Sequence, residues 1–114
     1  MHIKDLTPDD PAAIDQVAAI LVEGFREHWP DAWPTLEDAL EEVRESIEEG
    51  RISRIAVDED GRVLGWIGGQ HLYSRVWELH PLVVRTDQQG RGIGRALVAD
   101  LEALVRQRGA ITLM

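Results

Sequence analysis

A glutamate and a histidine stand two residues apart in the stretch WELHPLVV, residues 77–84. Successive side chains of a β-strand point to opposite faces of its sheet, so Glu78 and His80 would share one face of a strand. A carboxylate beside an imidazole can accept a proton or relay one, which is the work of a general base. The alternative is a polar sheet face on which a neighbouring carboxylate satisfies the histidine.

A glycine-rich stretch, QGRGIGR, follows at residues 89–95, just before a helical pattern. The first N–H groups of a helix have no partner within it, so they bind anions, phosphates above all. Glycines let the backbone approach a diphosphate closely, and Arg91 and Arg95 can add positive charge. The alternative is a tight turn with close helix packing. The stretch lacks the Lys-Ser or Lys-Thr of a P-loop, and its glycines have the wrong spacing for a dinucleotide fingerprint.

The surrounding elements follow from apolar periodicity and from turn residues. Helices are predicted from an entry at residues 7–11 to about Trp29, from Thr35 to Gly50, and over residues 92–108. Strands are predicted at residues 2–6, 52–57, 62–69, 77–84 and 110–114, with a hairpin turn at 58–61. Because Pro81 removes a ladder donor, strand 77–84 is expected to be irregular there. The order β-α-α-β-β-β-α-β, ending in a parallel crossover, predicts a mixed α/β sheet in one domain, residues 1–114.

Composition excludes several classes of protein. The chain has 114 residues, a formal net charge of −9 and no cysteine, so it has no disulfide, thiol nucleophile or thiolate metal site, and no metal is predicted. This charge argues against nucleic acid and anionic membranes as partners; it favours cationic partners or simply keeps the protein soluble. No apolar stretch approaches the roughly 18 residues of a membrane span. The polar N-terminus is unlike a signal peptide, and a cytoplasmic location is expected.

The glycine stretch also carries a family resemblance. Its residues 89–94, QGRGIG, match the Q/R-x-x-G-x-G/A signature of the GCN5-related N-acetyltransferases (GNAT), and the order of elements is similar to that family's N-terminal half. WELHPLVV, the Trp29-Pro30 segment and the ending RGAITLM resemble one branch, the aminoglycoside 6′-N-acetyltransferases. The resemblance implies a GNAT-like mixed sheet and acetyl-coenzyme A as co-substrate. It also implies acetyl transfer to a cationic small-molecule amine, first of all the 6′-amine of an aminoglycoside, and hence antibiotic resistance.

The same resemblance implies roles for single residues. Glu78 would be the general base or the carboxylate that positions the amine, and His80 would lie near the reacting amine. The N–H of Leu82 would polarise the thioester carbonyl, as a fixed donor aimed at developing charge does. The implied cofactor-binding residues are Leu82, Val83, Val84, Gln89, Gly90, Arg91, Gly92, Ile93, Gly94 and Arg95. Val84 would bond the pantetheine arm, and the loop would hold the pyrophosphate.

Acidic residues crowd the outer face of the predicted helix 35–50. They can attract the ammonium groups of an aminoglycoside, or they can form a solvated face, since one helix cannot aim all of them at one ligand. They are Glu37, Asp38, Glu41, Glu42, Glu45, Glu48 and Glu49. Trp29 and Trp33 can likewise wall a sugar site or anchor the core.

The family's domain usually continues with a further helix and two strands, which often supply a tyrosine that protonates the leaving thiolate. We expect these 114 residues to lack those strands and that tyrosine, since the only tyrosine is Tyr73 before the central strand. Three hypotheses follow: a C-terminally truncated enzyme domain, a homodimer in which a second chain completes the sheet, or a chain that binds coenzyme A without turnover. An acetyltransferase for a protein N-terminus, a lysine or a polyamine is a further alternative.

Overall fold

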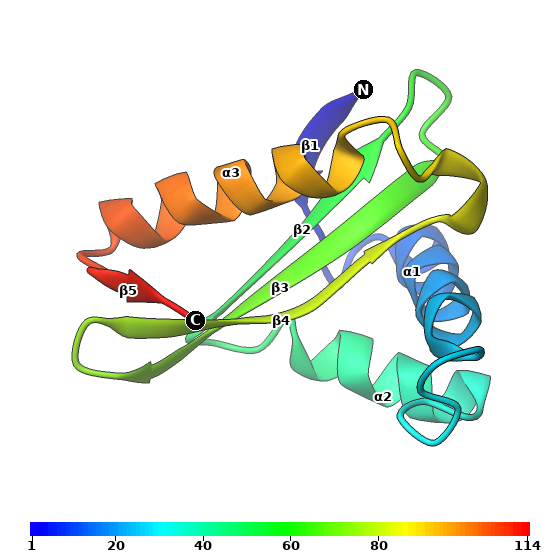
Figure 1. Ribbon diagram of the computed structural model, residues 1–114, viewed down its shortest axis with the longest axis horizontal. Helices are drawn as coiled ribbons and strands as arrows, with labels where there is room; N and C mark the ends of the chain where they lie inside the picture. Colours follow the sequence, from blue (N-terminus) through cyan, green and yellow to red (C-terminus); the bar gives the residue numbers. More distant parts are fainter.

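The structure, a computed structural model, describes residues 1–114 and is built around one twisted sheet (Figure 1). Five strands follow the order β1-β2-β3-β4-β5 across the sheet. The strands are β1 (His2–Asp5), β2 (Arg51–Val57), β3 (Val63–Tyr73), β4 (Val76–Val84) and β5 (Thr112–Leu113). The helices are α1 (Pro11–Phe25), α2 (Leu36–Glu45) and α3 (Ile93–Gln107), and a short 3-10 turn, η1 (Thr86–Gln88), precedes α3. This succession of elements confirms the predicted mixed α/β order.

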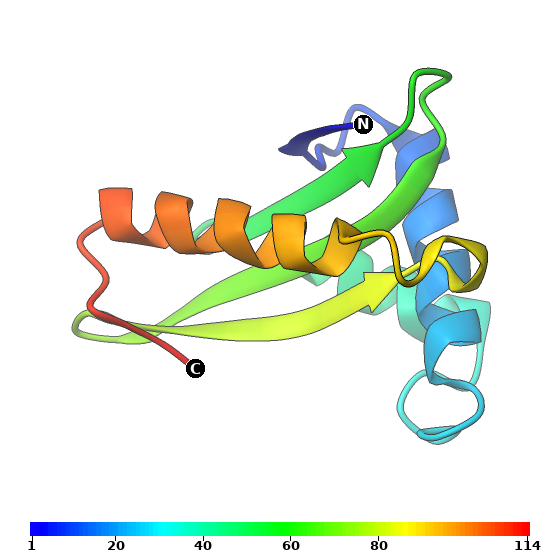
Figure 2. The same ribbon diagram turned by 45° about the horizontal axis from the view of Figure 1, so that its top comes forward.

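Strand pairing is antiparallel from β1 to β4, whereas β4 and β5 are parallel. The predicted parallel crossover through α3 is therefore confirmed. β5 is shorter than the predicted strand 110–114, because it pairs with β4 only at Val76↔Thr112 and Trp77↔Leu113. The second half of β4 consequently has no strand on its β5 side (Figure 2).

Helices cover both faces of the sheet, as Figures 1 and 2 show. α1 and α2 pack on one face, where Leu21 and Trp66 belong to a buried cluster of 14 residues. α3 packs on the other face, where Ile67 and Leu101 belong to a buried cluster of nine residues. No helix has both the length and the apolar character that crossing a membrane requires.

Two helices end earlier than the sequence predicts. α1 ends at Phe25, and one further turn, in which the Trp29 amide donates to the carbonyl of Phe25 at 2.8 Å, carries the chain to Pro30, before which a helix is disfavoured. α2 ends at Glu45, well before the predicted glycine stop. The Ser46 hydroxyl donates to the carbonyl of Val43, which is the acceptor that a continuing helix would need.

The start of α2 and the length of β3 also depend on local pairing. Thr35 caps α2 by accepting from the Asp38 amide at 3.2 Å, which confirms the predicted cap. β3 runs to Tyr73 instead of ending at residue 69, because Gln70 pairs with Glu78 across the hairpin. The glycines and polar residues there are typical of a strand end, but the partner strand keeps them in the sheet.

Candidate active site

β4 is irregular at the position where Pro81 predicts it. Its register against β3 runs from Ile67↔Leu82 to Gly69↔Leu79, so two residues of β4 lie opposite the single residue between them on β3, Gly68. A Cβ atom on Gly68 would lie 2.6 Å from the backbone oxygen of His80. Only glycine leaves room for this bulge, and the predicted irregularity is confirmed.

The bulge shifts the alternation of side chains along β4. Before it, Trp77 and Leu79 pack in the cluster under α3; after it, Leu82 and Val84 pack there. In an unbroken strand every second residue would stay on the same face. The bulge shifts this alternation by one, so odd-numbered residues face α3 before it and even-numbered residues face α3 after it. Val83 correspondingly packs under α1.

Glu78 and His80 belong to the opposite face, the one that α1 and α2 cover. Glu78 lies between two residues of the α3 cluster, so its side chain points away from that cluster. No hydrogen bond joins it to His80. The imidazole of His80 is 55% exposed, and its Nε2 lies 4.0 Å from Oε1 of Glu42 on α2. The nearest carboxylate to the histidine is thus Glu42, which sequence spacing does not single out.

Aromatic rings stand beside this histidine. The ring of Trp33 lies 5.9 Å from that of His80, tilted by 36°, and packs edge-on against Phe25 at 4.9 Å. Trp33 is partly buried against the α1–α2 cluster, whereas Trp29 is 66% exposed. Of the two tryptophans for which a role in the core was an alternative, only Trp33 packs against the core, and it does so next to His80.

The backbone of β4 offers hydrogen-bonding groups on its open side. The amide of Arg85 donates to Leu64 of β3 at 2.8 Å, and amide direction alternates along a strand, so the amides of Leu82 and Val84 point away from β3. On that side β5 reaches only as far as the bond from Leu79 N–H to Met114 O, 2.9 Å long. The edge from Leu82 to Val84 can therefore pair with an extended ligand.

The glycine loop connects this edge to α3. Gly90 and Gly92 have φ values of 82° and 81°, a left-handed conformation that only glycine adopts without strain. Gly92 caps α3 without a side-chain bond. None of the amides from Gly90 to Arg95 donates a hydrogen bond within the protein. The loop thus presents a row of N–H donors at a helix N-terminus, the arrangement that binds phosphate groups.

Side chains hold the loop in this position. Asp87 accepts from Arg62 at 3.0 Å, and Nε of Arg85 donates to the carbonyl of Val63 at 3.0 Å. The Gln89 side chain donates to the carbonyl of Val84 at 3.4 Å, so it lies across the open edge of β4. The contacts of Asp87 and Arg85 join the loop to the distant residues Arg62 and Val63, and no spacing rule predicts them.

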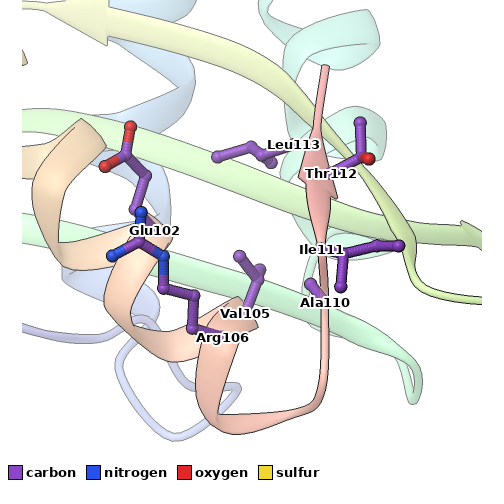
Figure 3. A pocket seen from close by; sticks show the side chains of 7 residues that line it. All are labelled: Glu102, Val105, Arg106, Ala110, Ile111, Thr112 and Leu113. Atoms are coloured by element: carbon purple, nitrogen blue, oxygen red, sulfur yellow. The ribbon is translucent and has the colours of Figure 1, made fainter.

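Two of the surface hollows that lie away from the loop flank the site and the end of α3. One, of about 420 Å³, is lined by acidic residues of α2 together with Asp31 and Trp33. The other, of about 210 Å³, lies between β5 and the last turns of α3, with Leu113 directed toward the helix (Figure 3). Glu42 lines the acidic hollow and also lies beside His80, so the predicted acidic face of α2 reaches the candidate active site. The second hollow lies at the end of α3 opposite the glycine loop.

The mixed sheet, the bulged central strand and the glycine loop together define the class of protein. The sequence profile of the acetyltransferase (GNAT) family matches residues 14–114. The chain therefore belongs to the GNAT family, which confirms the resemblance carried by the loop signature.

Three solved structures of aminoglycoside acetyltransferases are similar to nearly all of the chain. An aminoglycoside 6′-N-acetyltransferase complexed with coenzyme A is 35% identical with a TM-score of 0.85, covering 99% of this chain and 59% of that one. An aminoglycoside 6′-acetyltransferase type Ii is 36% identical with a TM-score of 0.83, covering 99% of this chain and 69% of that one. The aminoglycoside 6′-N-acetyltransferase from Enterococcus faecium is 36% identical with a TM-score of 0.82, covering 99% of this chain and 59% of that one.

These similarities confirm the GNAT-like fold over the whole chain. The chain spans less than two thirds of the length of the first of these structures, 59% of it. No curated protein sequence matches the chain.

Proposed function

We propose that the protein transfers an acetyl group from acetyl-coenzyme A to a primary amine, the 6′-amine of an aminoglycoside. One observation carries the proposal: the open edge of β4 at Leu82–Val84 leads directly into a loop of free N–H donors. The extended pantetheine arm of coenzyme A can pair with the open strand edge, and its pyrophosphate can accept hydrogen bonds from the loop amides. The choice of amine rests on the three aminoglycoside acetyltransferases that are 35–36% identical to this chain.

The residues of the loop fit the phosphates of coenzyme A. The amides from Gly90 to Arg95 are unpaired, and the exposed side chains of Arg91 and Arg95 add two positive charges to a chain of net charge −9. Nothing lies within 4 Å of where a Cβ would stand on Gly90 or Gly92, so a phosphate can approach the backbone there. We assign the pyrophosphate to residues 89–95, and the pantetheine arm to the outward backbone groups of Leu82 and Val84. Val83, the remaining residue that the resemblance implies, pairs with Trp66 of β3 and packs in the cluster under α1, so we leave it out of this assignment.

The chemistry then divides among β4 residues. When bound, acetyl-coenzyme A supplies an activated thioester. The amide of Leu82, fixed at the open edge, stabilises the charge that develops on the carbonyl oxygen. Glu78 binds the substrate ammonium and takes its proton directly or through water, and His80 lies beside the amine. No covalent enzyme intermediate is required, which suits a chain without cysteine.

The proposal extends to location and assembly. We place the protein in the cytoplasm, where acetyl-coenzyme A is available. We also propose a homodimer in which a second chain pairs along the free edge of β5, because Ile111 is 73% exposed and Met114 is 58% exposed at that edge, and an unpaired edge strand is a template for pairing. Sedimentation that gives a monomer at every concentration would remove the dimer from the proposal.

A substrate comparison tests the choice of amine. Kanamycin, which carries a 6′-amine, is compared with an analogue that carries a 6′-hydroxyl, and with a lysine peptide and a polyamine. We expect acetylation of kanamycin and none of the hydroxyl analogue. Faster acetylation of the peptide or the polyamine would assign the enzyme to that amine instead.

A further inference from the structure

Glu42 on α2 has a carboxylate that the proposed function does not use. Its side chain is only 23% exposed, and the one basic group near it is the imidazole of His80, whose Nε2 lies 4.0 Å from Oε1. No hydrogen bond within the protein reaches this carboxylate, and a shielded carboxylate is costly without a partner. We propose that Glu42 is a positioning residue, which orients the imidazole of His80 at the amine site. The inference rests on the proposed function only in placing the amine beside His80.

The packing of α2 fixes where this carboxylate lies. Val43, the next residue, is completely buried. The hydroxyls of Ser46 and Ser53 are 3.0 Å apart, and the Ser53 hydroxyl accepts from the indole N–H of Trp66 at 2.8 Å. This buried chain of hydrogen bonds joins α2 to β2 and β3, with every polar atom paired. Glu42 is therefore held on a fixed part of the helix.

Two further contacts position this histidine. The ring of Trp33 lies 5.9 Å from the imidazole, and the backbone oxygen of His80 lies against Gly68 at the bulge, which fixes the main chain there. The Glu42 carboxylate is a second neighbour of the ring, and the 55% exposure of the histidine leaves an open side for substrate. Glu42 thus acts on the amine through His80.

The neighbouring acid on α2 provides a matched control. Glu41 is exposed and forms no ion pair, while Glu42 is partly buried beside His80. Changing either glutamate to glutamine alters the net charge equally on the same helix. A difference between Glu42→Gln and Glu41→Gln must therefore come from the position of Glu42 beside His80, because the change in net charge is the same.

The first test observes the histidine directly, without any need for activity. The imidazole signals of His80 are assigned in heteronuclear NMR spectra by their loss in His80→Gln. We expect these signals to shift in Glu42→Gln and to stay in place in Glu41→Gln. Unmoved signals in Glu42→Gln would overturn the proposal. Glu42→Asp, which withdraws the carboxylate by one methylene, serves for the same comparison if Glu42→Gln does not fold.

The second test is a double-mutant cycle in the acetylation assay, which measures whether two residues act through one another. We expect Glu42→Gln to lower kcat about five- to tenfold, below the 10²–10⁴ typical of a general acid–base group, with a smaller change in the KM of the amine. In a His80→Gln background it should have no further effect. An equal rise of KM in both backgrounds would show direct contact with the amine and would overturn the proposal. Absence of all acetyl transfer would count against the proposed function alone, and the NMR comparison would still decide the role of Glu42.

Discussion

Backbone and side chains of β4 divide the proposed chemistry between them. The amides of Leu82 and Val84 turn to the open edge of the sheet, while Glu78 and His80 face the helices α1 and α2. The bulge at Pro81 causes this division. It inserts one extra residue between Glu78/His80 and Leu82/Val84, so the side chains of the two pairs lie on opposite faces of the sheet.

Glu78→Gln tests the proposed base at the residue scale. The amide keeps the shape of the side chain but cannot accept a proton, so we expect kcat to fall about 10²-fold or more. Acetylation rates and a melting curve measure activity and folding separately. Undiminished turnover in a folded variant would show that Glu78 is not the base.

The individual residues also show what sequence can and cannot reveal about the site. Pro81 predicts that β4 is irregular at this point, and the loop at the start of a helix predicts N–H groups without partners, because each effect depends on local chemistry. The approach of Glu42 to His80 depends on how α2 packs across the sheet, so no spacing within the sequence indicates it. The same holds for the contact between Arg62 and Asp87, which steadies the loop.

At the element scale, the position of α3 determines where the glycine loop lies. Arg54 on β2 donates to both carboxylate oxygens of Asp100 on α3, at 2.9 and 3.1 Å. The same guanidinium reaches Asp5 on β1 at 3.0 Å. The side chains of Arg54 and Asp100 are only 17% and 20% exposed, while Asp5 is 69% exposed. The pair with Asp100 therefore ties α3 to the sheet, and the pair with Asp5 is screened by water.

Asp100→Asn tests this tie. We expect a loss of about 1.5–3 kcal/mol in the free energy of unfolding, as for a hydrogen bond to a charged group. Asp5→Asn is the matched control and should cost less than about 1 kcal/mol. Urea denaturation measures both, and equal losses would mean that α3 is not held by this pair.

The pKa of Arg54 determines how the stabilisation by the Arg54–Asp100 pair depends on pH. Its hydrogen bond with Asp100 raises the pKa of the Arg54 guanidinium, against the opposing effect of burial. A raised pKa contributes stability that is present below the ordinary pKa of arginine and is lost only as pH rises through the higher value. The guanidinium therefore contributes equally throughout the neutral range.

The elements themselves were largely predictable, and their ends were less so. Apolar spacing located all three helices, since each helix buries one stripe of side chains. β3 continues past Gly69 because β4 pairs with it, and β5 is short because only Thr112 and Leu113 pair with β4. Both ends depend on a neighbouring strand, which local propensity does not describe.

At the scale of the whole molecule, the net charge of −9 should draw in a polycationic substrate. We expect the KM of an aminoglycoside to rise several-fold with added salt, because the Debye length falls from about 10 Å at 0.1 M to about 3 Å at 1 M. A monoamine acetylated by the same site should show a smaller rise. Initial rates at a series of salt concentrations measure both, and parallel curves would show that the acidic surface does not steer the substrate.

The central claim is that the loop and the open edge of β4 form a site for acetyl-coenzyme A. Calorimetric titration of the 114-residue chain with acetyl-coenzyme A tests it most directly. Gly94→Asp is the control, because a Cβ at Gly94 meets only ordinary contacts, the nearest at 3.6 Å, while the added carboxylate repels phosphate at the helix N-terminus. We predict saturable binding at one site that Gly94→Asp abolishes. Absence of binding by the unaltered chain, or equal binding by the variant, would contradict the claim.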